Sequence, residues 1–406
     1  MLRSSCAIAM AGLLAVACGS EVSDLAVGDV EYTTGPGGAE PNLQVTTDGR
    51  VLLTWLEPVS EGQHALRMAV RERGLWSDPK TVLESEHFFV NWADFPSLVE
   101  MGDGSWLVHW LEKTHGNKYA YHVKLAVSKD GGLAWGTSFS PHRDDSPTEH
   151  GFVSMVPWNE GAALIWLDGR AMTTEASGGE HEGLNLGEMS MRATTVTSDG
   201  ALGPDVLLDS RTCECCQTSL VRTSRGLLAA YRDRSEAEIR NIAVVRFVEG
   251  SWSEPSHVAD DNWYYPGCPV NGPQLSARGD TVVVSWFTAP DQQSAVYAAF
   301  SYDGGASFGA PIRIDDGDPL GRVDAEILDD GRAAVTWMER SEDAAEIRVR
   351  LVEPSATGPS YRVAQTSEAR ASGFPRIIQV GGEVLVAWTS VAEDGGVNVT
   401  ALRPPE

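Results

Sequence analysis

The chain has 406 residues, of which 57 are acidic and 31 are basic, so its formal net charge is −26. Such a charge repels nucleic acid, because no basic surplus is available to neutralise phosphates, and we therefore exclude nucleic-acid binding. The 42% hydrophobic and 22% charged residues, together with 41 Gly and 21 Pro, are typical of a turn-rich globular protein. They exclude a disordered chain and a coiled coil.

Residues 1–17 have the pattern of an export signal. A short start with one basic residue, Arg3, precedes an apolar run that is too short to span a membrane as a mature helix. Residues 14–19, Leu-Ala-Val-Ala-Cys-Gly, resemble a bacterial lipobox, which implies that Cys18 is lipidated and becomes the new N-terminus. The alternative is an ordinary signal peptide with a chance cysteine.

The resemblance implies an outer-membrane lipoprotein of the bacterial envelope, because Gly19 rather than Asp follows the cysteine. The alternative locations are the periplasm and the medium. Residues 18–24 are expected to form a linker, and no later segment has 18 consecutive apolar residues. We therefore expect contact with a membrane only through the lipid anchor, and the sequence carries no indication of an oligomeric state.

The strongest pattern is an internal repeat of seven units. Each unit has an apolar strand, a turn and a second strand that ends in an aromatic residue, as in residues 41–45 followed by 51–55. The aromatic residues recur every 51 to 65 positions, at Trp55, Trp110, Trp166, Tyr231, Trp286, Trp337 and Trp388. A third alternating strand follows in each unit, and a fourth follows in six of them.

Four short antiparallel strands in about 50 residues are typical of one blade of a β-propeller. The seventh unit ends near Arg403 without a fourth strand, whereas residues 25–32 form a strand that precedes the first unit. Pairing of these two would remove two open edges. The sequence therefore predicts that residues 25–406 form a single all-β domain, a seven-bladed β-propeller closed by residues 25–32, with a six-bladed propeller as the alternative.

Two turns between third and fourth strands fit the pattern Ser-x-Asp-x-Gly-x-x-aromatic. In them the Asp carboxylate can accept backbone N–H groups, and Gly supplies the positive φ of the turn. The turns resemble the Asp box of sialidases and other BNR-repeat proteins, in which the box is a structural staple. Their residues are Ser128, Asp130, Gly132 and Trp135 in one turn, and Ser301, Asp303, Gly305 and Phe308 in the other.

With its two Asp boxes and seven repeats, the chain from about residue 25 to 403 resembles bacterial sialidase-like propeller proteins. The resemblance implies an exo-alpha-sialidase-like lipoprotein, that is, a glycoside hydrolase. Established sialidases carry an early Phe/Tyr-Arg-Ile-Pro segment, which this chain lacks: residues 374–377 read Phe-Pro-Arg-Ile. No sialidase catalytic residue is carried over, and whether the protein is an enzyme stays open.

In a propeller, the residues that precede each first strand and the loops between second and third strands meet on one face, around the axis. We call this the axial face, and ligands are expected there because several blades converge. Its candidate ligand-binding residues are Asn91, Asp94, Arg170, Arg232, Arg234, Asn271, Arg322, Asp324 and Arg376. Arg234, Arg322 and Arg376 would hold the carboxylate of a glycan or another small anion.

Acidic residues stand two positions after the aromatic residue in five units, at Glu57, Glu112, Asp168, Asp233 and Glu339. They either bond to loop backbone or serve as acids and bases. We select Asp168 and Asp233 as candidate catalytic residues, because an arginine stands within two positions of each in the sequence. Glu149 and His150 are added because they directly precede a first strand, in a loop of two His, three carboxylates and one Arg that could bind a divalent cation or transfer protons.

Four cysteines remain after the leader: Cys213, Cys215, Cys216 and Cys268. They precede the first strands of consecutive units, so the repeat predicts that they cluster. In an exported protein they would form disulfides. The alternative is a thiolate site for copper, as Cu(I), or zinc.

Three hypotheses for the function follow. The first is a propeller that binds, and as an enzyme hydrolyses, a glycan or other anionic small molecule on the axial face. The second is a metal or redox protein built on the cysteines. The third is a scaffold without catalysis.

Overall fold

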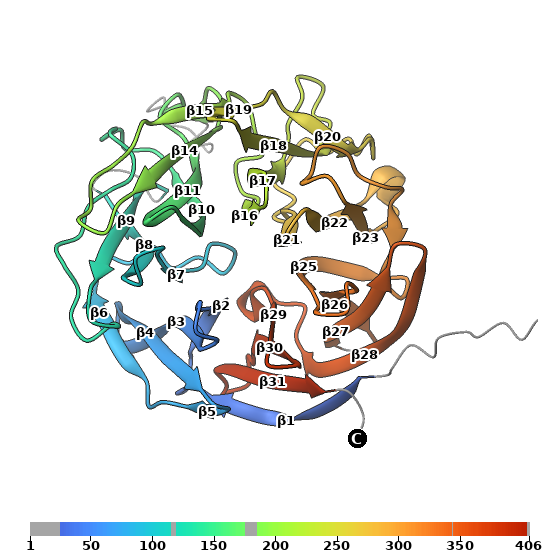
Figure 1. The fold of residues 1–406 in the computed structure, drawn as a ribbon, viewed down its shortest axis with the longest axis horizontal. Helices are drawn as coiled ribbons and strands as arrows, with labels where there is room; N and C mark the ends of the chain where they lie inside the picture. Colours follow the sequence, from blue (N-terminus) through green and yellow to red (C-terminus); the bar gives the residue numbers. More distant parts are fainter. Residues whose placement is uncertain (1–24, 115–118, 175–184, 343, 404–406) are drawn as a thin grey trace, which may run out of the picture.

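The computed structural model describes residues 25–114, 119–174, 185–342 and 344–403. Seven small antiparallel sheets stand around a central axis, each with its first strand innermost (Figure 1). The protein is thus an all-β, seven-bladed β-propeller, as the sequence repeat predicts. The six-bladed alternative is wrong, and the signal peptide and linker predicted for residues 1–24 lie outside the described residues.

Each blade contributes one strand to the wall of the axial channel. These innermost strands are β2 (Ala39–Val45), β7 (Ser97–Glu100), β10 (His150–Trp158), β16 (Ser219–Thr223), β21 (Gln274–Arg278), β25 (Pro319–Ile327) and β29 (Arg376–Val380). The second strands carry the repeated aromatic residues and are β3 (Val51–Ser60), β8 (Trp106–Lys113), β11 (Gly161–Asp168), β17 (Gly226–Arg232), β22 (Thr281–Thr288), β26 (Ala333–Ser341) and β30 (Glu383–Thr389).

The third and outer strands complete the blades. The third strands are β4 (Gln63–Glu72), β9 (Tyr121–Ser128), β14 (Ser190–Val196), β18 (Ile242–Val248), β23 (Ala295–Ser301), β27 (Ala344–Glu353) and β31 (Val397–Arg403). The outer strands are β5 (Leu75–Trp76), β6 (Lys80–Ser85), β15 (Val206–Asp209), β19 (Ser251–Trp252), β20 (Ser256–Ala259), β24 (Ile312–Arg313), β28 (Ala356–Thr366) and β1 (Ala26–Thr33). In the second blade the bridge between Leu125 and Phe139 takes this place.

Three short elements lie between these strands. β12 (Thr173–Thr174) pairs with β13 (Asn185–Leu186) in an insertion between β11 and β14, and the two 3-10 helices are η1 (Pro290–Gln292) and η2 (Arg370–Ser372). No helix among the described residues is long and apolar enough to cross a membrane.

The ring is closed by its N-terminal strand. β1 pairs antiparallel with β31, from Ala26 opposite Arg403 to Thr33 opposite Asn398, so the first strand of the chain is the outer strand of the last blade (Figure 1). Glu31 of β1 forms ion pairs with Arg403 and, at 3.0 Å, with Arg71 of the first blade. The prediction that residues 25–32 close the propeller is confirmed.

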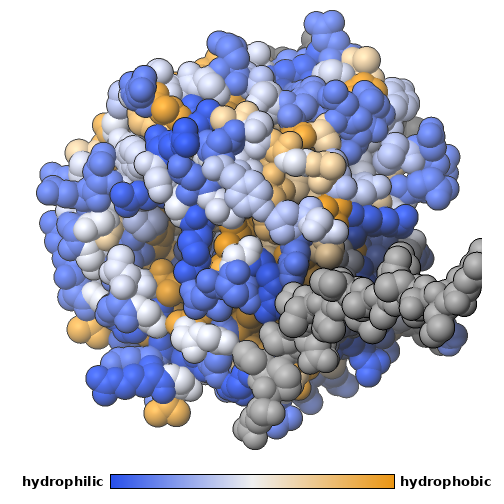
Figure 2. Space-filling view, turned by 45° about the vertical axis from the view of Figure 1, so that its right-hand side comes forward, coloured by the Kyte–Doolittle hydropathy of each residue, from blue (hydrophilic) through white to orange (hydrophobic). Residues whose placement is uncertain are grey.

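The repeated aromatic residues form the core between blades. Trp55, Trp166, Trp286 and Trp337 have no exposed surface, because each ring is covered by apolar side chains from a neighbouring sheet. Burial of so large an apolar area is the main stabilising term of the fold. On the surface, hydrophilic residues predominate on the face seen in Figure 2, and hydrophobic residues show as smaller patches between them.

Both Asp boxes bond as expected from their sequence. Asp130 Oδ1 accepts the Ser128 hydroxyl at 2.8 Å and the N–H groups of Leu133 and Ala134 at 3.0 and 2.9 Å. Asp303 repeats this arrangement with Ser301, Ala306 and Ser307. These boxes stabilise turns far from the axis.

Candidate functional site

The start of each innermost strand lies beside the end of the second strand of its blade. His150 stands opposite Asp168, Pro319 opposite Glu339, and a bridge joins Thr212 to Asp233. The segments that the repeat assigns to the axial face are therefore together, and two clusters of side chains with metal-binding chemistry lie there, one of histidines and carboxylates and one of cysteines.

Three of the five acidic residues that follow the blade aromatics have the same structural contact. Each accepts a hydrogen bond from the indole N–H of the tryptophan two positions before it. The distances are 3.1 Å from Trp55 to Glu57, 2.8 Å from Trp166 to Asp168 and 2.6 Å from Trp337 to Glu339. Glu339 also accepts the loop N–H of Asp318 at 2.6 Å. Accepting a buried indole N–H is thus the role of this position in three blades, whereas Glu112 lies 3.9 Å from Lys124 and Asp233 follows a tyrosine.

The histidine cluster is formed around His150, at the start of β10. Its Nε2 lies 2.9 Å from Asp144 Oδ2 and 3.8 Å from Asp168 Oδ1, and the ring stacks on His142 with centroids 4.1 Å apart. The edge of His122, from β9, contacts both rings. Sequence analysis selects His150 and Asp168 but not His122, because nothing in an alternating strand marks that residue as near the loop at 141–149.

The charge states in this cluster are set by burial and by neighbours. Burial, and then the nearby His150, lower the pKa of His142 to about 3, and burial also lowers the pKa of His122. Burial opposes ionisation of Asp168, but hydrogen bonds from Arg170 and the charges around it hold its pKa below the ordinary value. The imidazoles of His122 and His142 are therefore neutral at neutral pH, and the Asp168 carboxylate is ionised.

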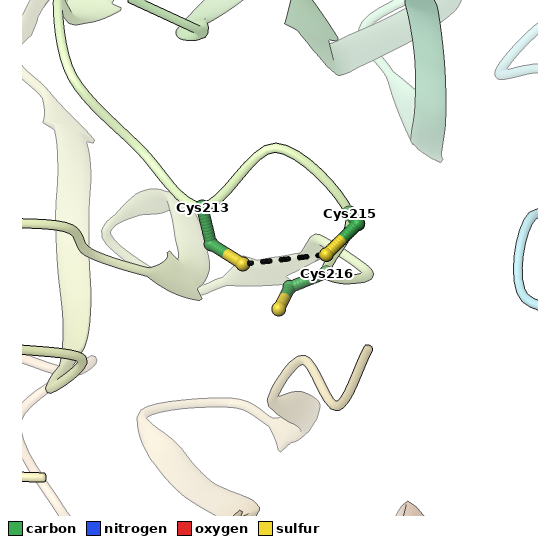
Figure 3. Close-up of side chains that lie close together, drawn as sticks. All are labelled: Cys213, Cys215 and Cys216. Carbon is green, nitrogen blue, oxygen red and sulfur yellow. Dashed lines mark hydrogen bonds between the residues drawn. The ribbon is translucent and has the colours of Figure 1, made fainter. Parts of the chain in front are cut away.

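The cysteine cluster precedes β16, on the loop at 212–218. The sulfurs of Cys213, Cys215 and Cys216 lie within 4.8 Å of one another, with 3.9 Å between Cys213 and Cys215, and all three point into one space (Figure 3). Cys213 and Cys216 are buried and Cys215 is half-buried. Cys268, before β21, is exposed, and its thiol interacts with that of Cys215.

The three thiols differ in acidity. Burial raises the pKa of Cys213 to about 12, and the neighbouring thiols raise that of Cys215. Burial opposes ionisation of Cys216 as well, but donation from the other thiols, the charge of Arg232 and the N–H of Asn271 lower its pKa well below the ordinary value. Cys216 is thus the most acidic of the three thiols, and the thiolate is the form that binds metals.

The arginines expected to hold an anion have internal partners. Arg232, which is 1% exposed, donates to the carbonyl oxygens of Asn271, Arg240 and Phe287 at 2.5 to 2.8 Å. Arg322 donates to the carbonyls of residues 368, 369 and 373, and its guanidinium lies 4.8 Å above the ring of Trp92. These two side chains join blades.

The other arginines are paired with carboxylates. Arg376 lies 3.2 Å from Asp324, Arg234 binds Glu238 at 2.8 Å and also Glu214, and Arg170 binds Asp168 at 2.7 Å. Asp233 contacts the ring of His257 at 3.2 Å, whereas the guanidinium groups of its sequence neighbours Arg232 and Arg234 bond elsewhere.

The remaining predicted ligand residues bind backbone. Asn271 accepts the N–H of Arg322 at 2.6 Å, and Asn91 accepts that of Ala93 at 3.1 Å. Asp94 is fully buried and accepts the N–H of Phe152 at 2.7 Å; burial raises its pKa to about 7, and the nearby Glu149 adds to the shift. Gln217, which sequence analysis does not select, links the carbonyl of Ala93 to the N–H of Gly272 and so holds the cysteine loop between blades.

No family model matches the sequence, and no curated protein matches it. Among solved structures, a protein of unknown function from Dyadobacter fermentans is 15% identical, with 94% of this chain and 99% of that chain covered and a TM-score of 0.53. A puromycin-hydrolysing peptidase of Mycobacterium tuberculosis is 9% identical, with 92% and 54% covered and a TM-score of 0.50. The NanB sialidase of Streptococcus pneumoniae is 13% identical, with 92% and 70% covered and a TM-score of 0.43. At these identities the first two similarities concern the fold alone.

Proposed function

We propose that the protein binds one soft metal ion, Cu(I) or Zn²⁺, through the thiolates of Cys213, Cys215 and Cys216 on the axial face. The observation that carries the proposal is the sulfur spacing. Two sulfurs that each lie about 2.3 Å from one tetrahedral zinc ion are about 3.8 Å apart, and Cys213 and Cys215 are 3.9 Å apart. Sulfurs in a disulfide are about 2.05 Å apart.

The surroundings of the sulfurs support a thiolate site. Arg232 and the N–H of Asn271 stabilise negative charge on Cys216, while burial of Cys213 and Cys216 shields the sulfurs from water and oxidants. Cys268 is the natural fourth ligand, since its thiol already interacts with Cys215. Because Cys268 is exposed, a metal ion can reach it directly from solvent.

The test is the metal content of a purified chain carrying Cys6→Ala and Cys18→Ala, so that the four cysteines of the propeller remain. Isolated without oxygen and dialysed against Cu(I) or Zn²⁺, it should retain about one equivalent. Cys216→Ser should abolish retention, whereas Cys268→Ser should weaken it. Intact mass under non-reducing conditions examines the alternative: two disulfides would lower the mass by two hydrogens each and would defeat the proposal.

The glycan or anionic ligand remains a prediction. Binding of a carboxylate by Arg234 or Arg376 would require that side chain to leave the acidic partner it has in this structure. Lipid anchoring on the bacterial envelope through Cys18 is likewise proposed on the resemblance of residues 14–19 to a lipobox.

A further inference from the structure

A single loop orients all three imidazoles of the histidine cluster. His142 Nδ1 faces the carbonyl oxygen of Asp144 at 2.8 Å, His122 Nε2 faces that of Ser146 at 3.2 Å, and His150 Nδ1 faces that of Thr148 at 3.3 Å. A carbonyl oxygen only accepts hydrogen bonds, so the facing nitrogen of each ring carries a proton. Histidines that bind metals are usually held in this way, with the other nitrogen left for the ion.

The second ring nitrogen of His150 faces carboxylates from two separate segments. Its Nε2, Asp144 Oδ2 and an Asp168 oxygen all lie within 4.8 Å of one another, and the side chains of His150 and Asp168 are completely buried. Nδ1 of the ring already faces an acceptor and carries a proton. Nε2 therefore either carries a second proton and donates it to the carboxylates, or has no proton and binds a cation together with them.

His142 gives an independent indication of a missing partner. Its side chain is 5% exposed, and its Nε2 is buried without a hydrogen-bond partner while the ring stacks on His150. A buried polar atom that has lost water and found no partner destabilises the fold.

The charges around the site favour a cation. Asp144 and Asp168 contribute two negative charges. Arg170 binds Asp168 and is also paired with Asp205 at 3.0 Å, and Arg192 in turn binds Asp205 at 2.6 Å. Arg170 therefore orients Asp168 and reduces its charge, so Asp144 is expected to be the stronger oxygen ligand. The Asp144 side chain is 22% exposed and offers access from solvent.

We propose that Asp144, His150 and Asp168 bind a divalent transition-metal ion, with the ring of His142 stacked on the ligand His150. A mixed imidazole and carboxylate set suits Zn²⁺, Fe²⁺ or Co²⁺, whereas the thiol cluster suits softer ions. The site is separate from the cysteine cluster and does not depend on its function.

The test uses Co²⁺ as the probe, because its absorption reports both the number and the type of ligands. The chain is prepared with Cys6 and Cys18 replaced by Ala and with Cys213, Cys215, Cys216 and Cys268 replaced by Ser, which removes the competing thiols. Co²⁺ should bind in a ratio of one to one, without a thiolate charge-transfer band, and His150→Ala and Asp144→Asn should each weaken binding at least about tenfold. His257→Ala is the matched control, since His257 also contacts two carboxylates but is 40% exposed.

Absence of Co²⁺ binding, or equal affinity in His150→Ala and in the control, would overturn the proposal. If His150→Ala does not fold, as judged by circular dichroism, Asp144→Asn decides alone, because Asp144 is partly exposed. A negative result in this experiment does not bear on the proposed thiol site, because the metal content of that site is measured on the chain that retains the cysteines.

Discussion

At the scale of single residues, close packing at Gly151 joins the second and third blades. A Cβ at this position would lie 2.2 Å from Asp94 Oδ2 and 2.9 Å from Tyr121 Cε2. Overpacking of this kind typically costs about 1–3 kcal/mol. Gly151→Ala should therefore lower the midpoint of thermal unfolding, whereas Gly136→Ala should leave it nearly unchanged, because the nearest atom there is 3.4 Å away.

Asp94 makes stability depend on pH. Burial raises its pKa from 3.8 to about 7, so between these values the folded protein holds a proton that the unfolded chain has lost. The contribution of Asp94 to the free energy of unfolding is therefore greatest below pH 3.8 and falls as the pH rises toward 7. Each pKa unit corresponds to about 1.4 kcal/mol, so the loss amounts to a few kcal/mol.

Asp94→Asn should remove this loss and raise the unfolding midpoint at pH 8 more than at pH 5. Asn can still accept the N–H of Phe152 through its amide oxygen. The exposed Asp145 provides the control, since Asp145→Asn should change both midpoints equally. Denaturant unfolding at the two pH values measures the difference, and an equal effect of both substitutions would contradict the assignment.

At the scale of elements, β1 is the strand on which closure of the ring depends. It pairs with β31 and carries Glu31, which bonds to Arg71 and Arg403. Removal of residues 1–33 would expose the edge of β31, and an open edge invites pairing with other chains. We expect a lower unfolding temperature and aggregation on heating, compared with a chain that lacks residues 1–24. Identical melting of the two chains would show that β1 adds nothing to closure.

At the scale of the whole molecule, the N-terminal lipid is predicted to decide where the propeller is located. Cys18→Ala should move the protein from the membrane fraction to the soluble fraction of cells, because the lipid on Cys18 is the anchor that residues 14–19 predict. Cys6→Ala is the control and should leave the distribution unchanged. If the Cys18 variant still sediments with membranes, the lipobox resemblance does not describe this chain.

The fold follows from the sequence because its determinants are local and repeated. Strand alternation, turn glycines and seven aromatic residues specify seven equivalent sheets, and the unpaired strand at residues 25–32 has one open edge to complete. The same regularity places Cys213, Cys215, Cys216 and His150 on the axial face, because equivalent positions in consecutive blades must meet around the axis.

Tertiary structure alone decides what the charged side chains do. Arg232 and Arg322 bind backbone carbonyls of neighbouring blades. Every residue has a backbone carbonyl, so the sequence does not identify the one that a given arginine binds. His122 reaches His142 and His150 only because the loop at 141–149 folds back over β9. The sequence by itself determines the seven-bladed ring and the face on which the candidate functional side chains lie. The hydrogen-bond and ion-pair partners of these side chains depend on distances that are set only when the blades pack together.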